Sequence, residues 1–148
     1  MSIVRAMVVA VRFVLVPGLF LACAGCSDSV TSPSGQAPFS QTDVRAGTGA
    51  AIISGSLATV HYTGWLYRES GTDGKGLQFE TSRSGEPFSF TVGVGQVIAG
   101  WDQGMLGMRV GGVRRLVIPP SLGYGPTRNG PLPPNATLVF EIELFDVE

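Results

Sequence analysis

The clearest pattern of hydrophobic and polar positions in this 148-residue chain lies between residues 87 and 106. Residues 88–92 alternate large apolar side chains with small polar ones, a period of two that is typical of a half-buried strand. Gly93 and Gly95 follow and permit a tight turn. The next apolar residues have the spacing of one helix face: Ile98, Trp101 and Met105. The stretch is therefore predicted to be a strand, a turn and a short helix that opens at residues 97 and 98.

The expected helix is weak by intrinsic propensity, so packing must hold it. It contains or borders Gly100, Gly104 and Gly107, and each glycine inside a helix costs about 1 kcal/mol relative to alanine. We expect the helix to lie across a sheet with Trp101 pointing inward, and with residues 97 and 98 lining an apolar cleft.

The rest of the folded part consists mainly of predicted strands. Alternating or β-branched segments place them at 42–46, 58–67, 77–81, 88–92, 113–118 and 137–147. In the last strand the glutamates at 141 and 143 face away from the apolar residues, which is typical of an antiparallel strand with one solvated face. A loop of proline, glycine and small residues separates the last two strands. Several strands with one short helix on a single face define an α+β domain at residues 42–148.

Residues 1–25 have the features of a secretory leader, with two arginines and then an apolar core of about a dozen residues, too short to span a bilayer. Ala24 and Gly25 precede Cys26, which resembles the site at which bacterial lipoproteins are cleaved and acylated. Cys26 is therefore the expected lipidated residue. Cys23 is the second candidate, and ordinary cleavage after Ala24 is the third. A disulfide or a redox pair is a weaker alternative, because the two cysteines end a leader rather than begin a helix after a strand.

Residues 26–41 are rich in serine, proline and glycine and are expected to form a flexible tether. With the leader, they predict an exported, membrane-anchored lipoprotein that faces the periplasm or the cell surface. The tether is too short and too polar to form a helical dimerisation module, so we expect a monomer. The formal net charge is −1 and no basic run occurs, which argues against a nucleic-acid partner.

Most residue combinations of common catalytic sites are missing from residues 42–148. This segment has one histidine, His61, which we expect to be structural, and no cysteine. It therefore offers neither a His/Cys metal cluster nor a cysteine nucleophile. Its Gly-x-Gly pairs complete no phosphate-binding motif. Glu80 and Asp102 are the candidate carboxylate pair for glycoside chemistry, but they lie on different predicted elements with nothing to bring them together. No cofactor is expected.

Aromatic residues remain, at spacings that allow them to surround one pocket: Tyr62, Phe79, Phe88, Trp101, Tyr124 and Phe140. The simpler interpretation is that they form only the hydrophobic core. Two observations favour a pocket. A tyrosine hydroxyl needs a partner if it is buried, and residues 122–125 lie in a long loop, where functional residues are often located.

Five separated motifs carry a family resemblance. They are VHYTGWL at 60–66, QFETSR at 78–83, PFSFTVGVGQVIAGWDQGMLGM at 87–108, GYG at 123–125 and LPPNATLVFEIEL at 132–144. In sequence and order they resemble the FKBP-type peptidyl-prolyl cis-trans isomerases, the immunophilins that bind macrolides such as FK506 and rapamycin. The resemblance covers about residues 42–148. It implies an antiparallel half-barrel sheet of five to six strands wrapped around the one short helix, with the active site between them.

The resemblance also implies a role for each matching position. Trp101 is expected to form the pocket floor. The expected walls and the last pocket loop comprise Tyr62, Phe79, Phe88, Val97, Ile98, Leu132 and Phe140. Tyr124 is expected to donate a hydrogen bond from the rim, and the backbone N–H of Ile98 to bind a substrate carbonyl.

The chain departs from the family pattern at three places. Glu80 stands where the family usually has aspartate, and the loop at 83–86 is one residue short and lacks a second basic residue. The loop after Tyr124 is also one residue short, which places Pro126, Arg128 and Pro131 at the rim. We expect the chain to remain catalytically active in spite of these three changes. We expect the changes to affect the efficiency of turnover and the affinity for macrolides.

The resemblance therefore implies an isomerase that acts on proline-containing polypeptides of exported proteins. The alternative is a tethered binding module that grips proline-containing segments without useful turnover. Glu80 is the sequence feature that supports this alternative.

Overall fold

The computed structural model describes residues 36–148. The expected leader (1–25), the expected lipidation at Cys26 and the tether as far as residue 35 lie outside the described residues. Within the described part of the chain, no helix has the length and apolar character that a membrane span requires.

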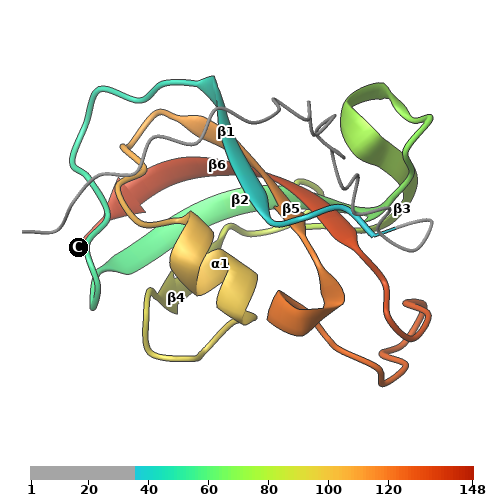
Figure 1. The fold of residues 1–148 in the computed structure, drawn as a ribbon. Coiled ribbons are helices and arrows are strands. Elements are labelled where there is room, and N and C mark those ends of the chain that lie inside the picture. Colours follow the sequence, from blue (N-terminus) through green and yellow to red (C-terminus); the bar gives the residue numbers. More distant parts are fainter. Residues whose placement is uncertain (1–35) are drawn as a thin grey trace, which may run out of the picture. The chain divides into compact units, whose positions relative to one another are not determined.

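The described residues form one antiparallel sheet with a short helix on one face (Figure 1). Its strands are β1 (Ser40–Arg45), β2 (Leu57–Tyr67), β3 (Lys75–Thr81), β4 (Phe88–Thr91), β5 (Val113–Ile118) and β6 (Leu138–Val147). The order is β1-β5-β6-β2-β3, and β4 also pairs with β2, so the six-stranded sheet does not close into a barrel. The helix α1 is Ala99–Gly104, and two 3-10 turns lie at Thr72–Gly74 and Pro120–Leu122. The prediction of an α+β fold with an antiparallel sheet around one short helix is confirmed.

Three elements begin two residues away from the expected position, and the other differences in boundaries are of one residue. Strand β1 begins at Ser40, inside the range expected to be a tether, and Phe39 before it packs against the core. Strand β3 begins at Lys75 rather than at residue 77. The helix begins at Ala99 rather than at Val97, because Ile98 has an extended conformation (φ −59°, ψ 146°) and precedes the first helical turn.

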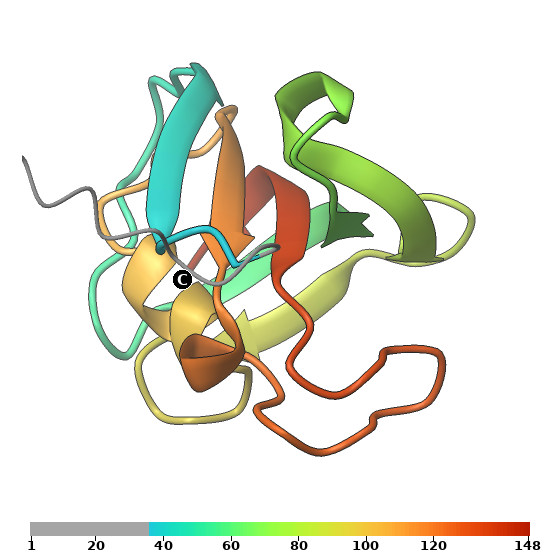
Figure 2. The same ribbon diagram turned by 45° about the vertical axis from the view of Figure 1, so that its right-hand side comes forward.

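The glycines of α1 allow close packing against β5. In Figure 2 the helix is yellow and this strand is orange. A Cβ atom at Gly100 would lie 2.6 Å from Cγ2 of Ile118, and one at Gly104 would lie 2.6 Å from Cδ2 of Leu116. Glycine therefore weakens the helix locally but lets its backbone approach the sheet. Packing turns Trp101 inward, where it is 4% exposed.

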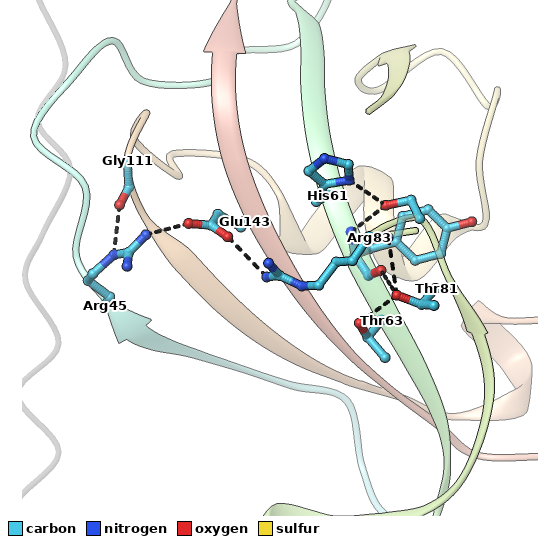
Figure 3. A network of polar contacts seen from close by, with 9 residues as sticks. Arg45, His61, Thr63, Thr81, Arg83, Gly111 and Glu143 are labelled. Carbon is cyan, nitrogen blue, oxygen red and sulfur yellow. Dashed lines mark hydrogen bonds and ion pairs between the residues drawn. The ribbon is translucent and has the colours of Figure 1, made fainter. Parts of the chain in front are cut away.

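The hydrophobic core lies between this helix and the concave side of the sheet. Strand β6 shows the expected alternation: its core-facing residues are Leu138, Phe140, Ile142 and Leu144, all buried. The intervening glutamates face the opposite side and form ion pairs. Glu141 pairs with Lys75 and Arg115. Glu143 pairs with Arg45 and Arg83 (Figure 3). The sheet therefore has one dry face, covered by α1, and one charged face.

Candidate active site

A cavity of about 410 Å³ opens between the helix, the sheet and two loops. It is lined by Glu80, Phe88, Gly95, Gln96, Val97, Ile98, Trp101, Tyr124 and Phe140. A second hollow of about 330 Å³ adjoins it, because Glu80 and Tyr124 line both. Phe79, Asn129, Pro131 and Leu132 complete the lining of this second hollow.

Trp101 is the centre of the aromatic cluster around the first cavity. The ring centroids of Tyr62 and Phe140 lie 5.1 and 5.3 Å from that of Trp101, both edge-on. The Phe88 centroid lies 6.3 Å away, also edge-on. These rings come from β2, β6 and β4, so the curved sheet brings together aromatic side chains that are distant in sequence. Edge-on pairs of this kind are a favoured aromatic geometry.

Gly64 provides the room that this cluster needs on β2. A Cβ at this position would lie 2.7 Å from Phe79 and 2.8 Å from Phe140. The centroids of those two rings are 5.7 Å apart. Any larger residue at position 64 would displace one of them.

The loop at residues 93–98 forms one wall of the cavity, and Asp102 determines its conformation. The Asp102 carboxylate accepts hydrogen bonds from the backbone N–H groups of Gly93 (2.8 Å) and Gly95 (2.9 Å). Both glycines have positive φ, at 83° and 76°, a region that side-chain-bearing residues rarely adopt. The Gln96 side-chain oxygen accepts the N–H of Thr91 at 2.8 Å and closes the loop back onto β4.

The backbone N–H of Ile98 has no hydrogen-bond acceptor among residues 36–148. Its carbonyl, by contrast, accepts the N–H of Trp101 at 2.9 Å. Ile98 lines the cavity, so its N–H remains available to a bound carbonyl group.

Two tyrosine hydroxyls lie near the Glu80 carboxylate. Burial raises the pKa of Tyr62 to about 12, and the adjacent Glu80 adds to the rise. Burial also raises the pKa of Tyr124, again with a contribution from Glu80. Both hydroxyls are therefore protonated at neutral pH and able to donate a hydrogen bond.

The indole N–H of Trp101 is buried and has no hydrogen-bond partner within the described range 36–148. An unpaired buried donor costs about 1–3 kcal/mol. Such groups are rare in a well-paired core and call for a specific explanation. Trp101 lines the cavity, so this unpaired N–H group belongs to a residue of the candidate site.

The residues after Glu80 hold its strand against β2. The Ser82 hydroxyl accepts the backbone N–H of Tyr62 at 2.9 Å, and the Thr81 hydroxyl donates to the Tyr62 carbonyl at 3.1 Å. His61 Nδ1 lies 3.0 Å from Oγ of Ser82. The His61 ring also packs edge-on against Phe145, with centroids 5.3 Å apart. His61 alternates with Tyr62 along β2 and so faces away from the cavity, in a structural role.

The structure brings most of the predicted site residues to one cavity: Glu80, Phe88, Val97, Ile98, Trp101, Tyr124 and Phe140. Phe79 and Leu132 line the adjoining hollow instead, and Tyr62 packs behind the lining against Trp101. Trp101 and Phe140 also belong to the hydrophobic core. These two residues therefore both pack in the core and line the cavity.

Sequence reasoning missed three contributors. Gly95 and Gln96 line the cavity, and Asp102 binds the loop that carries them. The sequence suggests a role for Asp102 only as a carboxylate partner of Glu80. An acidic residue in the first turn of a helix, soon after two glycines, is a signal for such a bond, since it can accept their backbone N–H groups.

The fold and the cavity define a domain in which a cavity with aromatic walls lies between a curved antiparallel sheet and a short helix. The sequence profile of the FKBP-type peptidyl-prolyl cis-trans isomerases matches residues 49–145. The chain belongs to this family and is an FKBP-type peptidyl-prolyl cis-trans isomerase.

Individual relatives agree with this assignment. An FK506-binding protein of Neisseria meningitidis serogroup A is 48% identical over 107 residues, which covers 71% of this chain and 92% of the relative. FK506-binding protein 1 of Gibberella zeae is 46% identical over 105 residues, covering 70% and 93%. The crystal structure of AtFKBP13 is similar with a TM-score of 0.63 at 36% sequence identity, over 74% of this chain and 93% of that one.

Proposed function

We propose that the chain isomerises X–Pro bonds of exported proteins by enclosing the proline in the aromatic cavity, without a covalent intermediate or a metal. Rotation about the bond has a barrier of about 18–20 kcal/mol because amide resonance must be broken. The planar amide is more dipolar than the twisted one, so water favours the ground state. An apolar cavity removes this advantage, and fixed donors stabilise the twisted geometry.

The observation that carries this proposal is the combination of aromatic walls with a free donor. Trp101 and Phe140 present apolar surface to the cavity, and the N–H of Ile98 is without an acceptor among the described residues. In the proposal the proline ring packs on Trp101, while Ile98 binds the carbonyl of the substrate. The Tyr124 hydroxyl, protonated at neutral pH, donates from the rim.

We propose a preference for an apolar residue before the proline, because two apolar side chains contribute to the adjoining hollow. Phe79 and Leu132 line this hollow together with polar residues, and Glu80 and Tyr124 line both the hollow and the main cavity. The test is kcat/KM for a series of peptides in which the residue before proline is leucine, alanine, glutamate or lysine. The proposal predicts the highest value for leucine. Equal values across the series would contradict the proposed preference for an apolar residue before the proline.

We propose further that macrolides such as FK506 and rapamycin compete for this cavity. The relatives named FK506-binding proteins support this proposal, as do the aromatic walls. The alternative function, a tethered module that binds proline-containing segments without turnover, rests on Glu80. A chain that binds the leucine peptide but does not accelerate its isomerisation would establish that alternative.

The proposed location is a membrane surface facing the periplasm or the cell exterior, with the isomerase domain held as a monomer through a lipid on Cys26. The leader and the small residues before Cys26 support this proposal. Labelled fatty acid should be incorporated into the wild-type chain and into Cys23→Ser, but not into Cys26→Ser. Incorporation that is lost only in Cys23→Ser would move the anchor to Cys23.

A further inference from the structure

Arg114 is a buried charged residue that the proposed mechanism does not use. It is 6% exposed and lies on the core-facing side of β5, in alternation with Leu116 and Ile118. A buried guanidinium is unfavourable unless its charge is paired and its donors are satisfied. The hydrogen-bond partners of Arg114 therefore show which parts of the fold the buried guanidinium connects.

Two of these contacts are to the last residue of helix α1, Gly104, and to Leu106, just after the helix C-cap. Nη1 of Arg114 donates to the carbonyl of Gly104 at 2.8 Å and to that of Leu106 at 3.0 Å. The last carbonyls of a helix lack partners within the helix and carry its partial negative charge. Arg114 supplies both the missing donor and a complementary charge.

The other contacts fix the guanidinium to strand β1. Nε donates to Oδ1 of Asp43 at 2.6 Å, and Nη2 donates to Oδ2 at 3.2 Å. This two-point geometry restricts the orientation of the guanidinium plane, which a lysine does not reproduce. The hydrogen bond from Arg114 lowers the pKa of Asp43, so the carboxylate is charged at neutral pH.

Helix α1 needs such support because it has six residues. Isolated helices of this length are not stable in water, so external contacts determine the position of α1. Trp101 lies in this helix, and its carbonyl accepts the N–H of Met105 at 2.9 Å. A shift at the end held by Arg114 therefore moves the ring of Trp101 at the cavity.

We propose that Arg114, oriented by Asp43, is a positioning residue for the isomerase reaction, which fixes the end of α1 and thereby the place of Trp101. The inference rests on the proposed function, in which the proline packs on Trp101. It makes β1, which precedes the family match at 49–145, part of the framework of the active site.

Arg115 provides a matched control in the same strand. It is adjacent to Arg114 but faces the charged side of the sheet, where it pairs with Asp73 at 2.7 Å and with Glu141 at 3.0 Å. Asp43 and Asp73 are also matched, with side chains 48% and 43% exposed. Each arginine and each aspartate can thus be tested against a counterpart that has no contact with α1.

The experiment measures kcat/KM for the leucine peptide in the full chain at low temperature, together with the urea midpoint, so that rates refer to folded molecules. Arg114→Met should lower kcat/KM about tenfold, since a misplacement of about 1 Å can cost up to a hundredfold. It should also change the tryptophan emission. Arg114→Lys should recover part of the rate. Arg115→Met should stay within about twofold of wild type in kcat/KM, because Arg115 contacts neither α1 nor the cavity.

Asp43→Asn tests the same inference with little risk to folding, because this side chain is half exposed. It should lower kcat/KM more than Asp73→Asn does. The inference about Arg114 would be overturned if folded Arg114→Met had the kcat/KM of wild type, or if the two asparagine variants had equal kcat/KM. In either case turnover by the wild-type chain would leave the proposed function intact. A wild-type chain without turnover overturns both.

Discussion

Replacing Phe140 by alanine tests whether its ring is a wall of the active site or only part of the core. The ring is 3% exposed, and its centroid lies 5.3 Å from that of Trp101 and 5.7 Å from that of Phe79. Truncating a buried phenylalanine costs about 3–5 kcal/mol. Domains commonly have about 5–15 kcal/mol of stability. The variant should therefore remain largely folded at low temperature, with a much lower urea midpoint.

The matched control is Leu144→Ala. Leu144 lies on the same strand and the same face, is fully buried, and does not line the cavity. Its truncation should cost about 2–5 kcal/mol, similar to the cost at Phe140. The two variants therefore differ mainly in the cavity wall that only Phe140 supplies.

The assay is X–Pro isomerisation at low temperature, with each rate divided by the folded fraction from the urea curve. Phe140→Ala should lose about a hundredfold in kcat/KM, because the substrate is no longer held in place. Leu144→Ala should keep the wild-type value per folded molecule. If both variants show equal turnover per folded molecule, Phe140 belongs to the core alone and the cavity is not the site of reaction. Phe140→Leu, which keeps most of the volume, provides a third point if Phe140→Ala is too unstable.

Three further perturbations follow from the structure. Glu80→Asp restores the usual family residue and should raise kcat/KM several-fold or leave it unchanged in the peptide assay; a large loss would refute the role carried over to this position. Gly100→Ala should destabilise the domain in urea, because overpacking against Ile118 costs about 1–3 kcal/mol and exceeds the gain in helix propensity of about 1 kcal/mol. Gly85→Ala, with open space around its Cβ, should have no such cost. Hydrogen bonds from Arg45 and Arg83 lower the pKa of Glu143 in the folded protein. Ionised Glu143 therefore adds to the free energy of unfolding above the unfolded pKa of about 4.3, and this stabilisation is lost as pH falls through the lower folded pKa. Urea midpoints between about pH 2 and 7 should therefore fall less steeply for Glu143→Gln than for wild type, and identical slopes would contradict this.

Local patterns in the sequence predicted most of the fold. The alternation in β6 identified its buried face, because side chains of a strand alternate between the two sides of the sheet. The spacing of Trp101 and Met105 identified the inward face of the helix, and both are buried. Family motifs then supplied the arrangement of strands, which no local pattern contains.

Contacts between residues distant in the chain were beyond local reasoning. Asp43 and Arg114 are 71 positions apart, and nothing in either neighbourhood indicates the pair. Gly100 disfavours a helix by its intrinsic propensity. In the structure a glycine is needed there, because a Cβ would come too close to the side chain of Ile118. The first residue of the helix was misplaced because the extended conformation of Ile98 depends on the loop before it.

The most direct test of the central claim is a rapamycin titration of the full chain. Isomerisation of the leucine peptide and macrolide binding, followed by tryptophan emission, are measured on the same samples. The account predicts that the chain accelerates isomerisation and that turnover disappears at the same rapamycin concentration at which the binding signal saturates. Turnover that persists when rapamycin is saturating would contradict the claim that the aromatic cavity around Trp101 is where the X–Pro bond rotates.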